Sequence, residues 1–574
     1  MSQLFDKIKV GTTKQNTFDL SHNQVTTSDF GYLVPICVRH MVPNDRFTVS
    51  PKLFTRLTPM VVPTYGRITC RLHHFFVPNR VLFPHWEPFI SQDRNNNYNP
   101  PYYTVSTLRQ ALQADPAFDP TVTGTRALYT RLMSNFGLNP KVIASDALSG
   151  GERIDAFPFL AYYRIWLDWF MDSNVYDHPA MVYDFNELIK DGGSLIGRAT
   201  NFLQYRNCCF KKDYFTTAKQ SPQDGAASKV GVDIASPVLN PGLDYPSGTS
   251  LDSVSVRNNS DGSVGLSANS PYSLPSGSNS KIGEFTVESF RAANALQRWL
   301  ERNNFVGTKI INRLLAHFGV APTPERLDMS EFIGGDSFPI QIGDVTSTSF
   351  EQGEGLYYGL GAQAGKGVGA SSSKSVSYHA KEHGVFMTLM SIIPDTAYYQ
   401  GIPRMWQKGV YGDALDYYTP EFENLGYQEI LNKEVFVPNV STGYLSYEPD
   451  GIFGYTPRYS EYKFQNDVLA GDFVTQNQIY DYFDMDSWHL FREMNFDENN
   501  PLALNENFVE LNNQNNSYDR IFQMTVNKFD HFYFNIFCDV KASRPMSSIS
   551  APSLDSTNNE DGQMMNLPYG GTRL

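Results

Sequence analysis

Charged residues are scarce in this 574-residue chain. Only 18% of its residues are charged, and 60 acidic residues against 46 basic ones give a formal net charge of −14. A protein dedicated to wrapping nucleic acid would be strongly basic, so the composition argues against that class. It leaves room for one basic face on an acidic body. With 41% hydrophobic residues the chain is nevertheless globular and not disordered.

Cysteine is scarce as well. The chain has five cysteines, widely scattered and without a CxxC pair or a Cys and His cluster. This pattern indicates neither a disulfide framework nor a zinc module, and we expect reduced, buried thiols. No run of about twenty apolar residues occurs, and the N-terminal MSQLFDKIKV lacks an apolar signal core. We therefore expect no membrane insertion and no signal-directed secretion.

Motifs for catalysis are missing too. Gly359–Ala370 satisfies a loose GxGxxG pattern twice, but the ASSSKSVS that follows is unsuited to the helix that a dinucleotide site needs. Lys366 is followed by glycine, so this is no P-loop. His379 and His383 have the spacing of a metal pair but no third ligand. We expect no enzyme, no metal and no cofactor.

Aromatic residues, in contrast, are abundant. They make up 14% of the chain, with 33 Tyr and 40 Phe. These residues favour strands and are enriched at subunit contacts, so they indicate a large β core, an extensive assembly surface, or both.

Several segments have the pattern of strands. Residues 66–78 alternate, with Ile68, Cys70 and Leu72 on an inner face, and Arg67, Arg71 and His73 on a basic outer face. The C-terminal run FDHFYFNIFCDVKA alternates in the same way and turns Phe532, Phe534, Ile536, Cys538 and Val540 inward. Glu382–Pro394 is apolar on both faces, which predicts a central strand.

Helices are few, and long insertions separate the strands. We expect helices within Phe157–Met171, Thr286–Asn304 and Thr308–Val320, the last ending at Gly319. We expect one domain over residues 1–574, built as a β-sandwich whose connections have grown. The insertions are a polar loop at 92–148, a Ser-, Gly- and Pro-rich surface segment at 221–280, and a glycine-rich loop at 353–373. An interdomain linker is the alternative for 221–280.

The stretch RNCCFKKDYFTTAKQSPQDG, Arg206 to Gly225, sits at the edge of the largest insertion. Strand alternation explains the adjacent Cys208 and Cys209 better than a redox pair. Lys211 and Lys212, close to Arg206, could meet phosphate or the carboxylates of a neighbouring subunit, or form a solvated basic face. These alternatives remain open, and we interpret the stretch as the last framework strand before the insertion.

Several blocks resemble the major capsid proteins of the Microviridae, especially the gokushovirus branch. They occur in order and span nearly the whole chain: residues 18–47, 75–90, 206–225, 317–335, 382–404, 416–430, 519–532 and 542–546. The resemblance implies an eight-stranded viral jelly roll that assembles, through pentamers, into a T=1 icosahedral shell around circular single-stranded DNA.

The resemblance also implies partners and a location. These are an internal scaffolding protein, a pilot protein, a small basic DNA-binding protein and a host receptor, with assembly in the host cytoplasm and residence in the virion. The 221–280 segment fits a three-fold protrusion that faces the host, and Tyr245, Arg257 and Tyr272 are its candidate contact residues. Candidates for contact with DNA or with other subunits are Arg67, Arg71, His73, Arg206, Lys211, Lys212 and an N-terminal arm with Lys7, Lys9 and Lys14.

The main alternative is a carbohydrate-binding jelly roll, such as a receptor-binding spike. It predicts a stable monomer or trimer with a cleft of convergent aromatic and acidic side chains. A nucleotide-binding enzyme would require the loop at Gly359 to hold phosphate, which its sequence context disfavours.

Overall fold

The computed structural model describes sixteen segments of the chain and divides it into two compact units. The first unit comprises residues 1–220 and 321–574, and the second comprises residues 221–320. Each unit is described by itself. The described segments are residues 15–91, 98–114, 129–145, 147–195, 200–225, 256–258, 263–266, 280–281, 287–346, 363–409, 414–438, 447–475, 485–492, 502–511, 518–523 and 530–546.

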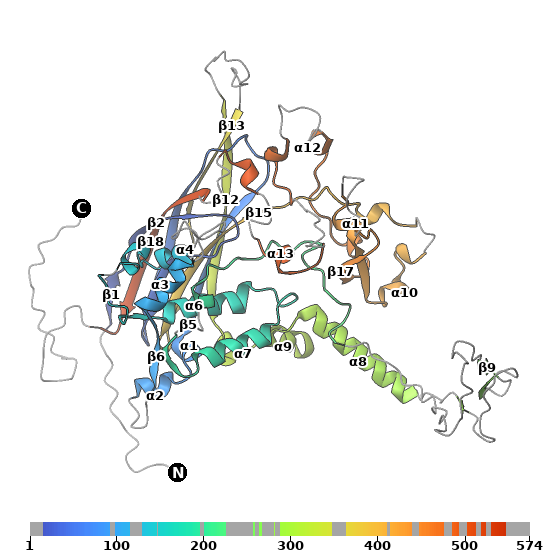
Figure 1. The fold of residues 1–574 in the computed structure, drawn as a ribbon, viewed down its shortest axis with the longest axis horizontal. Coiled ribbons are helices and arrows are strands. Elements are labelled where there is room, and N and C mark those ends of the chain that lie inside the picture. Colours follow the sequence, from blue (N-terminus) through green and yellow to red (C-terminus); the bar gives the residue numbers. More distant parts are fainter. Residues whose placement is uncertain are drawn as a thin grey trace, which may run out of the picture. The chain divides into compact units, whose positions relative to one another are not determined.

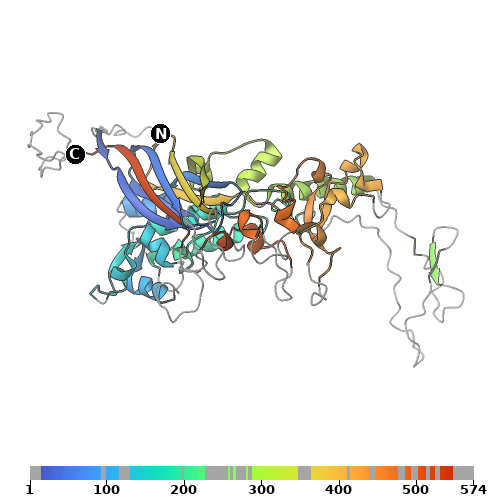
Figure 2. The ribbon, with the colours of Figure 1, turned by 90° about the horizontal axis from the view of Figure 1, so that it is seen from above.

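The first unit is built on a large curled antiparallel sheet of ten strands (Figures 1 and 2). Its main path runs β1-β18-β4-β13-β12-β5-β15-β3, with β2 beside β18 and β14 beside β4. The strands are β1 Asn16–Asp19, β2 His22–Ser28, β3 Val34–Met41, β4 Arg46–Leu57, β5 Ile68–Pro78, β12 Glu331–Thr346, β13 Gln363–Ser372, β14 Val376–His379, β15 Gly384–Pro394 and β18 Phe532–Arg544.

The fold class expected from the sequence is confirmed: the chain is mostly β, with few helices, and the sheet is consistent with a jelly-roll capsid domain. The sheet has ten strands where eight are expected, because short strands share a neighbour. Strands β2 and β1 pair with successive parts of β18, and β13 and β14 pair with successive parts of β4.

The core lies where the alternation places it. All eleven positions of β15 are buried, as expected for a central strand, and Phe534 and Ile536 on β18 are 1% and 0% exposed. On β5, Ile68, Cys70 and Leu72 are fully buried. The inward sets predicted for these strands are therefore correct.

A helical layer packs on one part of this sheet (Figure 1). Helix α6 (Phe157–Ile165) continues as the π-helix η1 (Trp166–Phe170) and contacts β5 and β15. A buried ion pair, Arg164 Nε to Asp168 Oδ2 at 3.0 Å, fixes the end of α6. Asp168 also accepts hydrogen bonds from the backbone and hydroxyl of Ser330, just before β12. These contacts hold η1 over the outer side of β5.

The remaining elements of the first unit are short. Its helices are α1 Asn79–Leu82, α2 Trp86–Ile90, α3 Val105–Gln113, α4 Tyr129–Asn135, α5 Pro140–Ile143, α7 His178–Ile189, α10 Pro420–Glu423, α11 Asn432–Val435, α12 Asp472–Thr475 and α13 Glu506–Val509. Its small strands are β6 Asn99–Thr104, β7 Arg153–Asp155, β8 Gly192–Ser194, β16 Tyr427–Leu431 and β17 Ile452–Pro457. Short 3-10 turns lie at 200–203, 324–327, 404–406, 414–416, 460–462, 485–488 and 518–521.

The second unit contains helices α8 (Val287–Val306) and α9 (Ile310–Phe318) and the short strands β9 Val256–Asn258, β10 Ser263–Leu266 and β11 Ser280–Lys281. Gly319 ends α9 with a φ of 68°, as the sequence predicts. Helix α9 has no buried residue, and this includes its apolar stripe, Ile311, Leu314, Leu315 and Phe318. Leu315 and Phe318 are 53% and 75% exposed.

Three sequence predictions need correction. The 92–148 segment is not a plain loop, since β6, α3, α4 and α5 lie in it. Residues 363–372 of the predicted glycine-rich loop form β13, which pairs with β4 and β12 and has glycine at 365 and 367, where a Cβ would meet Val62 and Leu57. Residues 206–212 form no framework strand; they join the sheet region through isolated bridges from Asn207 to Tyr32 and from Cys209 to Glu510.

Candidate interaction surfaces

The outer face of β5, which the sequence predicts to be a basic contact surface, is largely covered. Phe75 is 1% exposed. The His73 ring lies 5.5 Å from the ring centroid of Phe170 in η1 and 6.0 Å from that of Phe332. Burial lowers the pKa of His73 to about 4, with a smaller effect from the positive charge of Arg71. His73 is thus neutral at physiological pH and offers no cation, while Arg71 stays half-buried beside it.

The uncovered end of β5 brings two sequence-predicted candidates together on one carboxylate. Arg67 Nη1 lies 3.8 Å from Asp395 Oδ2, and Lys211 Nζ lies 3.5 Å from Asp395 Oδ1. Strand β15 ends at Pro394, opposite Ile68, which positions Asp395. Both cations are exposed, so these ion pairs contribute little stability, about 0–1 kcal/mol each. Asp395 nevertheless neutralises part of the positive charge of Arg67 and Lys211.

Arg206 and Lys212 have partners within the same unit. The guanidinium of Arg206 lies 4.6 Å from the Trp166 ring centroid and 4.9 Å from that of Tyr163. Lys212 donates to the Asp172 carboxylate and, at 3.2 Å, to the Thr216 carbonyl. Both side chains are therefore engaged in holding the 206–216 segment.

Of the two adjacent cysteines, Cys208 is buried and Cys209 is half-buried. Cys208 is 2% exposed, and burial raises its pKa to about 12. Burial also raises the pKa of Cys209, whose thiol lies 3.2 Å from the Phe170 carbonyl. The Cys208 N–H donates to the carbonyl of Gly31, which has a φ of 82° and no room for a Cβ beside Leu511. Both cysteines thus pack within the first unit, although not on the strand that the sequence interpretation gave them.

Several candidate residues from both units fall outside the described part of the chain. Tyr245 and Tyr272 lie outside the described residues, as do Lys7, Lys9 and Lys14. Arg257 lies on β9, where it is paired with Gly265 on β10.

A different surface has the features expected of an interaction face. It is the solvent side of β1, β2, β18, β4 and β13, here called the outer sheet face. Its rings Phe54, Tyr533 and Phe537 are 38%, 45% and 42% exposed. Tyr533 stands opposite Arg56, and Phe537 opposite Lys52, while Phe54 lies between these two cations along β4.

The charge on the outer sheet face is positive, against the charge of the whole chain. Outward positions of β1, β2, β18, β4 and β13 carry two carboxylates, Asp19 and Asp539, with Asp539 4.0 Å from Lys52. The cations at these positions are more numerous: Arg46, Lys52, Arg56, Lys366 and Lys541.

Two of the rings, Phe54 and Phe537, and the cation Lys52 line a hollow on this face. Arg56 lies over the Phe54 ring, with its guanidinium carbon 5.2 Å from the centroid, and Lys52 Nζ lies 5.7 Å from that of Phe537. The hollow has a volume of about 400 Å³ and is lined by Asn23, Lys52, Leu53, Phe54, Asn535 and Phe537. It combines ring faces, positive charge and two amides that can both donate and accept hydrogen bonds.

The sequence contained a signal for this face. Residues 46–57 alternate as cleanly as 66–78, with Arg46, Lys52, Phe54 and Arg56 at one parity. The alternation of residues 532–541 also predicts that Tyr533 and Phe537 point outward. The alternation alone cannot distinguish the β5 face from the β4 face, because the residues of η1 that cover β5 are distant in the sequence.

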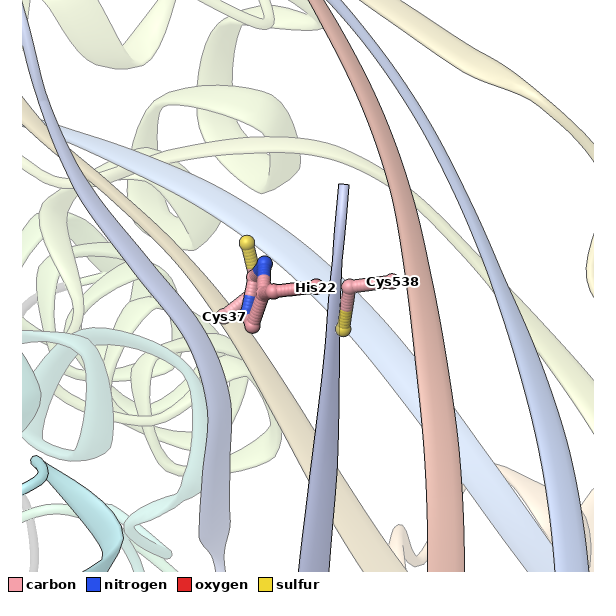
Figure 3. Close-up of side chains that lie close together, drawn as sticks. All are labelled: His22, Cys37 and Cys538. Atoms are coloured by element: carbon pink, nitrogen blue, oxygen red, sulfur yellow. The ribbon is translucent and has the colours of Figure 1, made fainter. Parts of the chain in front are cut away.

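On the opposite side of the sheet lies a small cluster of potential metal ligands, one half-buried and two buried (Figure 3). His22, Cys37 and Cys538, from β2, β3 and β18, place their ligand atoms within 4.8 Å of one another. A hydrogen bond from Cys538 lowers the pKa of Cys37 and raises that of Cys538. Arg39 places a guanidinium nitrogen 3.4 Å from His22 Nδ1, and this positive charge opposes a bound cation. The described part of the chain has one further such group, Asp29, Asp519 and His531.

Comparisons with known proteins add a second line of evidence. The profile of a capsid protein (F protein) family matches residues 6–554. The capsid protein VP1 of Chlamydia phage 1 is 26% identical over 96% of this chain and 98% of its own length. VP1 of Bdellovibrio phage phiMH2K is 26% identical over 96% and 97%, and VP1 of Spiroplasma virus 4 is 24% identical over 85% and 86%. Among the described residues, no helix is long and apolar enough to cross a membrane.

Proposed function

This chain belongs to the capsid (F) protein family of the Microviridae, and from that premise we propose that it forms a T=1 icosahedral shell around circular single-stranded DNA. It is a structural protein whose relatives are capsid proteins, and family membership implies self-assembly in a virion. The family match over residues 6–554 is the observation that carries the proposal. It also favours a shell subunit over a carbohydrate-binding spike.

The composition of the surface supports assembly. In the described part of the first unit, large apolar side chains remain exposed in several places, including Trp406 at 71%, Met405 at 58% and Tyr183 at 65%. In the second unit, no apolar side chain of α9 is buried. Aromatic residues and methionine are enriched at the contacts between subunits, so these side chains are suited to meeting other copies.

The second unit is the proposed host-facing protrusion. It begins at Ser221, where the Ser-, Gly- and Pro-rich segment begins, and extends to Val320, beyond the end of that segment at 280. Replacing residues 221–320 with a glycine-rich bridge should preserve folding of the first unit and abolish attachment to host cells. Loss of all soluble protein would contradict the insertion model.

The proposed partners are an internal scaffolding protein, a pilot protein, a small basic DNA-binding protein and a host receptor, with assembly in the host cytoplasm. A separate basic protein would help to neutralise the genome, since this chain has a net charge of −14.

Native mass tests the proposal most simply. Light scattering after size-exclusion chromatography, at low and moderate salt, should show pentamers or shell-sized particles when the chain is co-expressed with the scaffolding protein. Particles recovered from infected cells should carry nuclease-protected single-stranded DNA. A strict monomer under every condition, with binding to saccharides, would favour the spike.

A further inference from the structure

We propose that the outer sheet face is a binding surface for single-stranded DNA, on which Phe54, Tyr533 and Phe537 stack bases and Lys52 and Arg56 hold phosphates. The inference rests on the proposed function, because it names the surface by which the shell protein would contact its genome.

Charge complementarity is the first argument. Nucleic acid is repelled by a chain of net charge −14, so binding must concentrate where positive charge is local. This face carries five cations, Arg46, Lys52, Arg56, Lys366 and Lys541, against two carboxylates, Asp19 and Asp539. The Arg67 and Lys211 cluster shares its charge with Asp395, and His73 is neutral. On the outer sheet face Lys52 lies 4.0 Å from Asp539, while the guanidinium of Arg56 lies over the Phe54 ring.

The rings are the second argument. Proteins that bind single strands without sequence preference combine a basic groove with aromatic side chains on which successive bases stack. Tyr533 and Phe537 lie on β18, and Phe54 lies between them on β4, directly opposite Asn535. Diagonal neighbours across two strands are about 7–8 Å apart, a spacing that an unstacked strand can follow base by base. Each ring has a cation beside it for the adjoining phosphate.

The hollow is the third argument. Its volume of about 400 Å³ is open to solvent between the Phe54 and Phe537 rings. Asn23 and Asn535 line it, and their amides can donate to and accept from the edges of any base. An acidic surface of a second copy is the other polyanionic occupant, but it would not need ring faces that alternate with amides and cations.

Binding of labelled oligothymidylate to the purified full-length chain, followed by fluorescence anisotropy over a salt series, tests the proposal. Phe54→Leu, Tyr533→Leu and Phe537→Leu remove a ring and keep an apolar side chain, so each should weaken binding about tenfold. Trp406→Leu, at a ring 71% exposed elsewhere in the unit, is the matched control and should leave affinity unchanged.

The salt dependence of binding distinguishes cations that contact phosphates from cations that do not. Lys52→Gln and Arg56→Gln should each lower the slope of log K against log salt by about 0.7, the value for one phosphate on a single strand. Arg67→Gln and Lys211→Gln, in the cluster predicted from sequence, should leave the slope unchanged.

Several outcomes would overturn the proposal. These are an absence of oligothymidylate binding, ring variants that bind like the unmodified chain, or a slope that falls only with the Arg67 and Lys211 variants. A change in native mass without a change in DNA affinity would assign the face to a second copy. If the ring variants still form DNA-filled shells with unchanged affinity, this inference fails while the proposed function stands; if the unmodified chain never assembles, the proposed function fails.

Discussion

Strands β4 and β5 have similar sequence patterns and opposite surroundings. Each alternates apolar with polar or basic side chains, and each has its inward residues in the core. On β5 the second face is covered by η1 and by Phe332, so Phe75 is buried and His73 is neutral. On β4 the second face is open, and its cations and rings meet solvent. Alternation thus identifies the two faces of a strand, and long-range packing decides which of them is free.

The largest expected effect comes from placing a charge on the inner face of β18 instead of its outer face. Phe534→Asp places an unpaired charge at a position 1% exposed, which should cost more than about 4 kcal/mol and prevent folding. Tyr533→Asp, at the adjacent residue, should fold normally because that side chain is 45% exposed. Soluble yield and circular dichroism would report both. A folded Phe534→Asp variant would show that the strand register is wrong.

A matched pair of Phe→Ala substitutions compares the stability that a phenylalanine contributes on the covered face of β5 and on the open face of β4. Phe75→Ala should destabilise the protein by about 3–5 kcal/mol, because it empties a site enclosed by Trp169, Phe170 and Phe332. Phe54→Ala should cost about 1 kcal/mol or less. Urea unfolding of the two variants gives both values, and equal losses would remove the distinction between the strands.

Low pH should weaken the β5 region. Burial lowers the pKa of His74 to about 4 from its ordinary 6.5. The unfolded chain therefore binds the proton first as the pH falls, so the stability is complete above about pH 6.5 and is lost towards pH 4. The loss amounts to about 3 kcal/mol for this group. Unfolding free energies measured between pH 7 and 4.5 should fall, and less steeply in His74→Gln; an equal fall in both would contradict the assignment.

The smallest effect is expected at Asp395. Asp395→Asn leaves Arg67 and Lys211 without their shared carboxylate and should change stability by less than about 1 kcal/mol. It should also give the open end of β5 a weak, salt-sensitive affinity for DNA that the unmodified chain lacks there. Anisotropy with oligothymidylate in a Lys52→Gln, Arg56→Gln background measures it, and no gain would show that the carboxylate is not what suppresses binding.

Much of the first unit could be predicted from the sequence. The inward residues of β5 and β18, the fully buried β15 and the glycine that ends α9 follow from local periodicity and capping. The site could not be predicted as easily. The neutrality of His73 depends on Phe170, nearly a hundred residues away, and the pairing of Arg67 depends on Asp395, which lies still farther along the chain. The strand at 363–372 was missed because glycine and serine have low strand propensity and form β13 only between β4 and β12.

Cross-linking of the genome inside intact particles tests the central claim most directly. DNA-filled shells would be irradiated with ultraviolet light, digested, and the peptides that carry nucleotides identified by mass spectrometry. The account predicts cross-links on the peptides of β4 and β18, at Phe54, Tyr533 or Phe537. Cross-links confined to the Arg67 and Lys211 region, with none on the outer sheet face, would contradict it.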